Sequence, residues 1–164
     1  ARVVAGGETR TESVWRGLEA VRTEGVGVVA VHDAVRPLVT PEEIDATVRA
    51  AESTGAAILA ARAVDTVKES DGDETARVAR TLDRSRLWHA QTPQCFRLGL
   101  LRRAYESALA EGRADATDDS ALVERLGAPV RIVEGGPHNF KVTSPRDFAL
   151  AELIVQSSKF QVQS

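Results

Sequence analysis

The feature that most constrains the fold is the alternation of short apolar segments with amphipathic ones. Residues 26–31 are continuously apolar and rich in valine, as expected for a strand covered on both faces, and residues 56–61 repeat the pattern. Between them, residues 40–43 (Thr-Pro-Glu-Glu) combine an N-cap, a proline at the first helical position and a glutamate three residues after the cap. They predict a helix that runs to about Ser53. This order of elements predicts an α/β fold with a mostly parallel sheet.

The remaining elements follow from the same periodicities. Val14, Leu18 and Val21 recur at helical spacing and predict a helix over residues 11–23. The other predicted elements are a strand at 3–4, a loop at 91–94, helices at 98–110 and 118–126, a strand at 130–133, an extended piece at 139–142 and a last helix from 144.

Residues 63–88 interrupt the alternation. Two β-rich pieces, 64–68 and 76–82, flank Ser70-Asp71-Gly72-Asp73, and Asp-Gly is a strong hairpin signal. The pieces carry too little apolar surface for a second core, so we expect them to project as a β-hairpin arm that packs against something else. The simplest candidate is a second copy of the same chain.

Composition limits the classes of partner. A chain of 164 residues with 43% hydrophobic and 27% charged content predicts one globular domain over residues 1–164. A net charge of −3 gives no field that would gather nucleic acid or an anionic membrane, so we expect neither partner. Cys95 is the only cysteine, which excludes an intramolecular disulfide and favours a reducing, cytoplasmic compartment.

The polar turn at residues 31–37 (Val-His-Asp-Ala-Val-Arg-Pro) directly follows a predicted strand, where open α/β sheets bind ligands. Asp33 can hold a divalent cation, and the planar fork of Arg36 can grip a phosphate. An Asx-turn with a solvated arginine explains the same spacing equally well. His32 is interpreted as structural.

Other candidate residues have simple structural explanations. Lys141 lies between apolar neighbours, and a lysine there either points to solvent, which the sequence favours, or meets an anion. Charged residues on the arm are also typical of edge protection. Asp118 and Asp119 fit helix capping better than metal binding. The histidines and Cys95 lack the spacing of a zinc site.

Taken in order, these motifs resemble the 2-C-methyl-D-erythritol 4-phosphate cytidylyltransferase family from about Val3 to Ile154. Each motif is modest alone, and their shared order makes the resemblance specific. The motifs are Gly6-Gly7-Glu8-Thr9-Arg10-Thr11-Glu12-Ser13-Val14, the turn at 31–37, Val64-Asp65-Thr66-Val67-Lys68, Leu82-Asp83-Arg84, Leu87-Trp88, Gln91-Thr92-Pro93-Gln94, Thr117-Asp118-Asp119 and Asn139-Phe140-Lys141-Val142-Thr143.

The resemblance implies a Rossmann-like nucleotidyltransferase sheet and the transfer of CMP from CTP to 2-C-methyl-D-erythritol 4-phosphate. The products would be 4-diphosphocytidyl-2-C-methyl-D-erythritol and pyrophosphate, in isoprenoid biosynthesis by the non-mevalonate pathway. It further implies Mg²⁺, a homodimer joined through the arm, and a bacterial-type cytoplasmic enzyme. A plastid targeting segment upstream stays an open alternative.

The resemblance also assigns roles to individual residues. The nucleotide side would comprise Gly7, Glu8, where the family often has Asp, Ser13, Asp33 and Ala34, with Asp33 also holding the Mg²⁺. The acceptor would meet Arg36, Thr92 and Lys141 of one subunit and Asp65, Thr66 and Arg84 from the partner's arm. The residues at Arg84 and Lys141 would position the acceptor phosphate for attack.

Family members begin with a glycine-rich loop that cradles the triphosphate, and the printed sequence has no such loop. We therefore expect an N-terminally incomplete copy of a longer enzyme. The alternatives are a ribitol 5-phosphate cytidylyltransferase, which Leu82-Asp83-Arg84 and Leu87-Trp88 fit less well, and a non-catalytic dimerising remnant of the fold.

Overall fold

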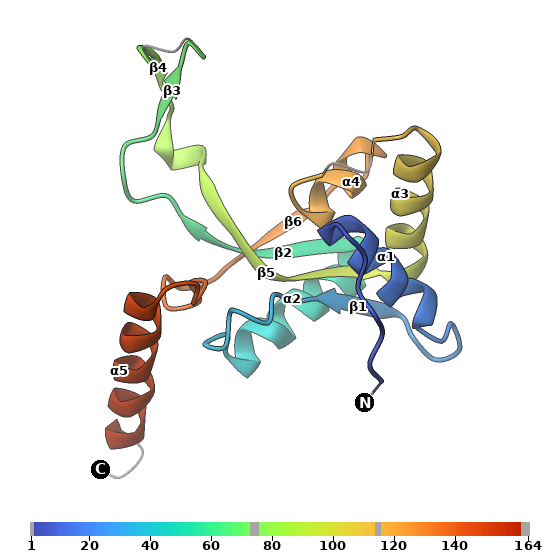
Figure 1. Ribbon diagram of the computed structural model, residues 1–164, viewed down its shortest axis with the longest axis horizontal. Helices are drawn as coiled ribbons and strands as arrows, with labels where there is room; N and C mark the ends of the chain where they lie inside the picture. The colour runs from blue at the N-terminus through green and yellow to red at the C-terminus, as the bar shows by residue number, and fades with distance from the viewer. Residues whose placement is uncertain (1, 73–75, 114–115, 162–164) are drawn as a thin grey trace.

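The computed structural model describes residues 2–72, 76–113 and 116–161. Its centre is a sheet in the strand order β1-β5-β2-β6 (Figure 1). These strands are β1 (Val28–Val31), β2 (Ala56–Arg62), β5 (Trp88–Arg97) and β6 (Arg131–Glu134). β2 and β6 are parallel, whereas β5 is antiparallel to both β1 and β2. In the described sheet, β1, β2 and β6 thus share one direction, and β5, which lies between β1 and β2, runs the opposite way. The α/β class is confirmed, and the sheet contains both parallel and antiparallel pairs.

Helices cover both faces of this sheet, because neighbouring residues of a strand point to opposite sides. Phe96 belongs to an apolar cluster with α1, α3 and α4, while its neighbour Cys95 packs with Ala51 of α2. The capping box of Thr40 and Glu43 starts α2, as predicted. The helices are α1 (Arg10–Ala20), α2 (Pro41–Thr54), α3 (Leu98–Ala110), α4 (Asp119–Arg125) and α5 (Pro145–Gln161).

One sequence prediction is wrong: residues 91–94, expected as a loop, lie within β5. The pairing of β5 with β1 ends at Gln94, and the register with β2 shifts between Ile58 and Ala60, opposite this stretch. Pro93 has no backbone N–H to give to a ladder, and it lies where the ladder is interrupted. The peptide bond before Pro93 is cis. The strand thus continues past Pro93, and its pairing with β2 is interrupted between Ala90 and Gln94.

Two other expectations also fail. Residues 2–7 carry no regular structure, and Val3 is almost fully exposed, so the predicted strand at 3–4 does not form. β1 is only partly buried, with Ala30 exposed, because it lies at the edge of the described sheet. Its valine-rich sequence had predicted cover on both faces.

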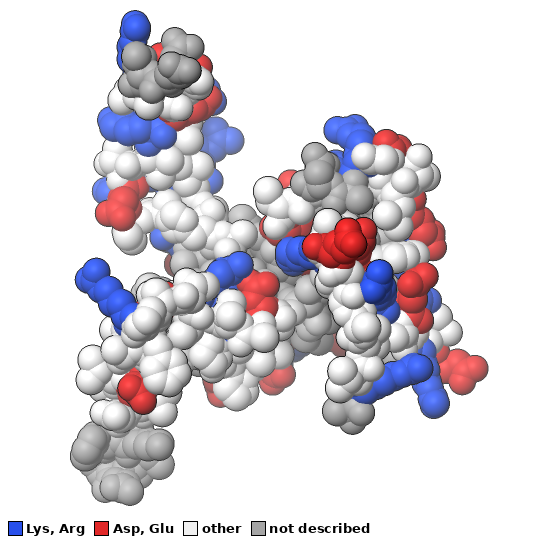
Figure 2. All heavy atoms as spheres, viewed as in Figure 1, with Lys and Arg blue, Asp and Glu red and all other residues white. Residues whose placement is uncertain are grey.

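The predicted hairpin forms from β3 (Lys68–Ser70) and β4 (Val78–Thr81), with Gly72 at φ +83° in the turn. Asp73 lies outside the described residues. In Figure 1 the arm, residues 63–88, points away from the sheet, and α5 extends in another direction. Figure 2 shows charges of both signs along the arm and a largely uncharged surface on α5. Among the helices of the described residues, none combines the length and the apolar content that a membrane span requires.

Candidate active site

Thr92 of β5 organises the turn that follows β1. The Asp33 amide donates to Thr92 Oγ1 at 3.0 Å, and this hydroxyl lies 3.0 Å from His32 Nδ1. His32 Nε2 is 3.0 Å from the carbonyl oxygen of Arg36, so a neutral imidazole protonated on Nε2 satisfies both contacts. His32 therefore has the structural role that the sequence indicated, and Thr92 ties the turn to the sheet.

Arg36 is buried, which decides against the solvated arginine that the sequence left open. Its side chain is 9% exposed. The guanidinium donates to Asp33 Oδ2 at 3.3 Å, to the Asn139 carbonyl oxygen at 2.6 Å and to the Ala90 carbonyl oxygen at 3.5 Å. An arginine held by three acceptors is a fixed cation rather than a mobile one.

Lys141 meets an anion, contrary to the preference for solvent that its sequence context suggested. Its Nζ lies 3.0 Å from Asp33 Oδ2, although half of the side chain remains exposed. Burial acts to raise the pKa of Asp33, but the hydrogen bond and charge of Lys141, followed by those of Arg36, outweigh it and hold that pKa below its ordinary value. The turn and the 139–143 segment, more than 100 positions apart, thus converge on one carboxylate.

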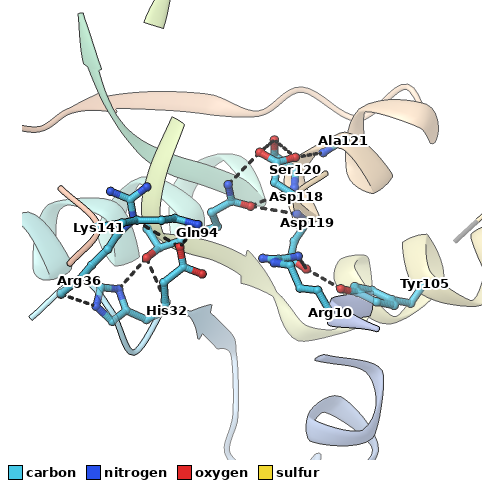
Figure 3. A network of polar contacts seen from close by, with 12 residues as sticks. Arg10, His32, Arg36, Gln94, Tyr105, Asp118, Asp119, Ser120, Ala121 and Lys141 are labelled. Carbon is cyan, nitrogen blue, oxygen red and sulfur yellow. Dashed lines mark hydrogen bonds and ion pairs between the residues drawn. The ribbon is translucent and has the colours of Figure 1, made fainter. Parts of the chain in front are cut away.

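These side chains open onto a cavity of about 360 Å³, which we call the polar cavity. It combines cationic, anionic and hydroxyl groups, and Figure 3 shows the side chains of this region converging from separate parts of the chain. The residues that line it are Arg10, Asp33, Arg36, Ala90, Gln91, Thr92, Gln94, Thr117, Asp118 and Lys141.

A second network borders the polar cavity at the start of α4, and none of the sequence motifs predicts it. Gln94 Oε1 accepts from the amides of Asp119 and Ser120, both at 3.1 Å. Gln94 Nε2 donates to Asp118 Oδ2 at 2.9 Å. Asp118 is the N-cap of α4, as expected. The side chain of Gln94 therefore joins β5 to α4 beside the cavity.

Asp119 is not a second cap but a buried partner of α1. It is fully buried, and its carboxylate accepts from Arg10 Nη1 at 3.1 Å and Nη2 at 2.6 Å. The Tyr105 hydroxyl donates to the same carboxylate. The available signal was the doubled acid at residues 118–119, since one carboxylate suffices to cap a helix.

Of the residues predicted for the nucleotide, Asp33 lines the polar cavity, whereas Gly7, Glu8 and Ser13 lie around the start of α1. The Gly7 amide donates to Ser13 Oγ at 3.0 Å, and the Glu8 amide donates to Glu12 Oε2 at 2.7 Å. A side chain at Gly7 would collide with that of Glu12, so only glycine fits. Ala34 lines a separate apolar groove beside α5. None of the predicted Gly7, Glu8, Ser13 and Ala34 lines the polar cavity.

The predicted residues of the arm are exposed and lie away from this cavity. Asp65, Thr66 and Arg84 are all exposed, and none lines the polar cavity of its own chain. Arg84 Nη1 donates to the Val64 carbonyl oxygen at 2.7 Å, within the arm. The structure thus brings Asp33, Arg36, Thr92 and Lys141 together and leaves the arm residues apart.

A divalent cation fits this site only with help from a ligand. Both cations contact Asp33 Oδ2, while Oδ1 has no hydrogen bond or ion pair with any described residue. No group of three or more His, Cys, Asp or Glu side chains in the described ranges is arranged to hold a metal. Mg²⁺ is commonly held by one or two carboxylates together with phosphate and water oxygens. Asp33 suits such a cation if phosphates complete its shell.

Comparison with known proteins matches this arrangement to one family. The model of the 2-C-methyl-D-erythritol 4-phosphate cytidylyltransferase family matches residues 1–157. A relative of that name from Symbiobacterium thermophilum is 44% identical over 160 residues, which are 98% of this chain and 66% of the relative. Another from Acidobacterium capsulatum is 48% identical over 151 residues, which are 92% of this chain and 63% of the relative. The chain spans slightly less than two thirds of the length of these relatives.

Solved structures agree with the sequence comparison. A 4-diphosphocytidyl-2C-methyl-D-erythritol synthase from Anaerococcus prevotii superposes with a TM-score of 0.86 at 34% identity, over 94% of this chain and 70% of the other. A 2-C-methyl-D-erythritol 4-phosphate cytidylyltransferase from Thermus thermophilus gives 0.82 at 38% identity, over 93% of this chain and 72% of the other. By sequence and by structure, this chain belongs to the 2-C-methyl-D-erythritol 4-phosphate cytidylyltransferase family.

Proposed function

We propose that this chain carries the acceptor and metal side of an enzyme that transfers CMP from CTP to 2-C-methyl-D-erythritol 4-phosphate and releases pyrophosphate. The observation that carries the proposal is the position of Asp33 between Lys141 and Arg36 at the polar cavity. Together with Thr92, these are the residues to which the resemblance assigns the metal and the acceptor. A cytoplasmic location belongs to the proposal and rests on the lone, buried thiol of Cys95.

The two cations suit different tasks. Lys141 is half-exposed and touches Asp33 at the cavity surface, so it can exchange this carboxylate for a phosphate of the acceptor at little cost. Arg36 is fixed by backbone carbonyls and keeps Asp33 in place when Lys141 turns to the ligand. The transfer joins two anions, and fixed positive charge lowers their repulsion while orientation supplies much of the remaining rate enhancement.

Asp33 is the residue that would hold Mg²⁺, through the oxygen that neither cation contacts. When bound, the metal neutralises charge on the nucleotide phosphates. No side chain of the cavity has to act as a covalent nucleophile, because the acceptor phosphate is itself the attacking group.

The arm completes the site in a homodimer. Arg84, Asp65 and Thr66 are exposed on the arm, which points away from its own sheet (Figure 1). An isolated two-stranded hairpin is marginally stable in water and gains most from packing on another surface. We place these side chains at the polar cavity of a second copy, where Arg84 faces the acceptor phosphate.

The test is pyrophosphate release from CTP and 2-C-methyl-D-erythritol 4-phosphate with Mg²⁺. It uses the 164-residue chain and the same chain preceded by the residues of the Symbiobacterium thermophilum relative that come before the matched region. We expect the joined chain to release pyrophosphate only when both substrates are present. Preference for ribitol 5-phosphate would overturn the acceptor. No release by a folded, dimeric protein with either acceptor would favour the non-catalytic module.

A further inference from the structure

Arg10 borders the polar cavity, and the function proposed above gives it no task. Figure 3 shows Arg10 and Lys141 on opposite sides of Gln94. The Arg10 side chain is 37% exposed, although the carboxylate of its partner Asp119 is fully buried. One edge of the guanidinium therefore faces the protein, while the remainder is open to the cavity that it lines.

The guanidinium has hydrogen-bonding capacity to spare. Its two contacts with Asp119 occupy one N–H of each terminal nitrogen. An arginine carries further N–H donors, and those of Arg10 have no hydrogen-bond partner among the described residues. Asp119 is itself fixed by the Tyr105 hydroxyl and, through its amide, by Gln94. The free donors of Arg10 are thus held in a constant orientation before any ligand arrives.

We propose that Arg10 binds a phosphate oxygen of the ligand in the polar cavity, from the side opposite Lys141, an inference that rests on the proposed cytidylyl transfer. A planar fork with free donors matches the geometry of a phosphate group, and such charge-assisted hydrogen bonds are the strong ones. The phosphate belongs either to the nucleotide or to the acceptor, because the proposed transfer brings both to Asp33. Lys141 and Arg10 would then hold a phosphorylated ligand from two walls.

The electrostatic surroundings of Arg10 keep it in its charged form. The hydrogen bond to Asp119 raises the pKa of Arg10, burial opposes the rise, and the charges of Asp119, Tyr105 and Asp33 add to it. The guanidinium therefore stays charged at the edge of the cavity that it lines.

The competing explanation is that Arg10 only neutralises Asp119, because a buried carboxylate requires a paired cation. Arg10→Lys separates the two roles. An ammonium can neutralise Asp119, but it lacks the further planar N–H donors with which the guanidinium would bind a phosphate. Arg49→Lys is the matched control, since Arg49 is exposed on α2, pairs with Asp45 at 3.9 Å and does not line the polar cavity.

The experiment is calorimetric titration of the 164-residue chain with CTP, with 2-C-methyl-D-erythritol 4-phosphate and with unphosphorylated 2-C-methyl-D-erythritol, each in Mg²⁺. For Arg10→Lys we expect an unchanged unfolding midpoint and about tenfold weaker binding of one phosphorylated ligand. The unphosphorylated polyol and the control variant should show no change. The weakened ligand identifies the phosphate. Wild-type affinity of Arg10→Lys for both phosphorylated ligands would overturn the proposal.

A second variant tests the proposal if Arg10→Lys does not fold. The double substitution Arg10→Gln with Asp119→Asn removes the buried charges together and keeps an amide pair, and we expect the same selective loss of phosphate affinity. Loss of the fold in both variants would overturn the proposal, because Arg10 would then act by stabilising the chain. If the wild-type chain binds neither phosphorylated ligand, the proposed function itself fails, which the titrations distinguish from failure of Arg10 alone.

Discussion

The candidate residues of the polar cavity and those of the arm differ in how far the chain itself holds them. Around the cavity, Asp33, Arg36 and Thr92 are each held by other parts of the same chain, from β1 to the 139–143 segment. On the arm, Arg84 donates to the Val64 carbonyl oxygen of the same arm, and Asp65 is exposed. One chain is thus sufficient to shape the cavity, whereas its arm residues lie exposed and away from that cavity.

The surface of α5 resembles the arm, because its side chains are also largely exposed. Large apolar side chains there are exposed, and Figure 2 shows few charges on this helix. Burying such side chains would contribute roughly 25 cal/mol per Å² of apolar area. The exposed set comprises Phe148 at 59%, Leu150 at 49%, Leu153 at 60% and Val155 at 43%.

The largest effect on stability should come from the cavity side. Asp119→Ala removes the partner of Arg10 and leaves the buried Tyr105 hydroxyl without its acceptor, and an unsatisfied buried polar group costs about 1–3 kcal/mol. We expect the free energy of unfolding, measured in urea, to fall by that amount. A loss below about 1 kcal/mol, the range of exposed ion pairs, would show that the network does not hold the cavity.

The arm should matter for turnover rather than for stability. Arg84→Ala removes an exposed cation, so we expect the unfolding midpoint to stay constant while turnover of the joined enzyme falls by about 10²–10³-fold. Asp33→Ala should be similarly inactive, because it removes the proposed metal ligand.

Mixing these two inactive variants sharpens the comparison further. In a two-fold dimer, a mixed pair combines the intact arm of one subunit with the intact cavity of the other, so random mixing should restore about a quarter of the activity. Proven heterodimers without activity would contradict the assignment of the arm to the partner's site.

The sequence predicted local structure well and long-range contacts poorly. The capping signal at Thr40 and the Asp-Gly of the hairpin act through neighbouring residues, and both predictions are confirmed. The pair of Arg10 and Asp119 joins residues 109 positions apart, and no local pattern encodes it. Pro93 misled the prediction, because a strand tolerates proline where its ladder is interrupted, and that interruption depends on the partner strand.

A smaller effect should appear in the titration of Asp33. Its pKa is held below the ordinary value by Lys141 and then by Arg36, against the opposing effect of burial. The folded-state pKa is thus the lower one, so the stabilisation is present above the unfolded-state pKa and is lost as the pH falls through the folded-state pKa. NMR titration of the carboxyl carbon should give a midpoint below 3.8, and Lys141→Ala should raise it. An unchanged midpoint in the variant would show that the contact with Lys141 does not persist in solution.

The smallest effect should come from an ion pair on the arm. Arg80 Nε lies 2.5 Å from Glu69 Oε2 across the hairpin, a shorter contact than that of Lys141 with Asp33. Both side chains are largely exposed, at 68% and 46%, so water and salt screen the attraction. We expect Arg80→Ala to change the free energy of unfolding by less than about 1 kcal/mol, and less still in high salt. A loss comparable to that of Asp119→Ala would mean that Arg80 is buried in solution, as it would be beneath a second copy of the chain. Measuring the variant over a range of protein concentrations separates the two cases, because stabilisation by a partner grows with concentration and stabilisation within one chain does not.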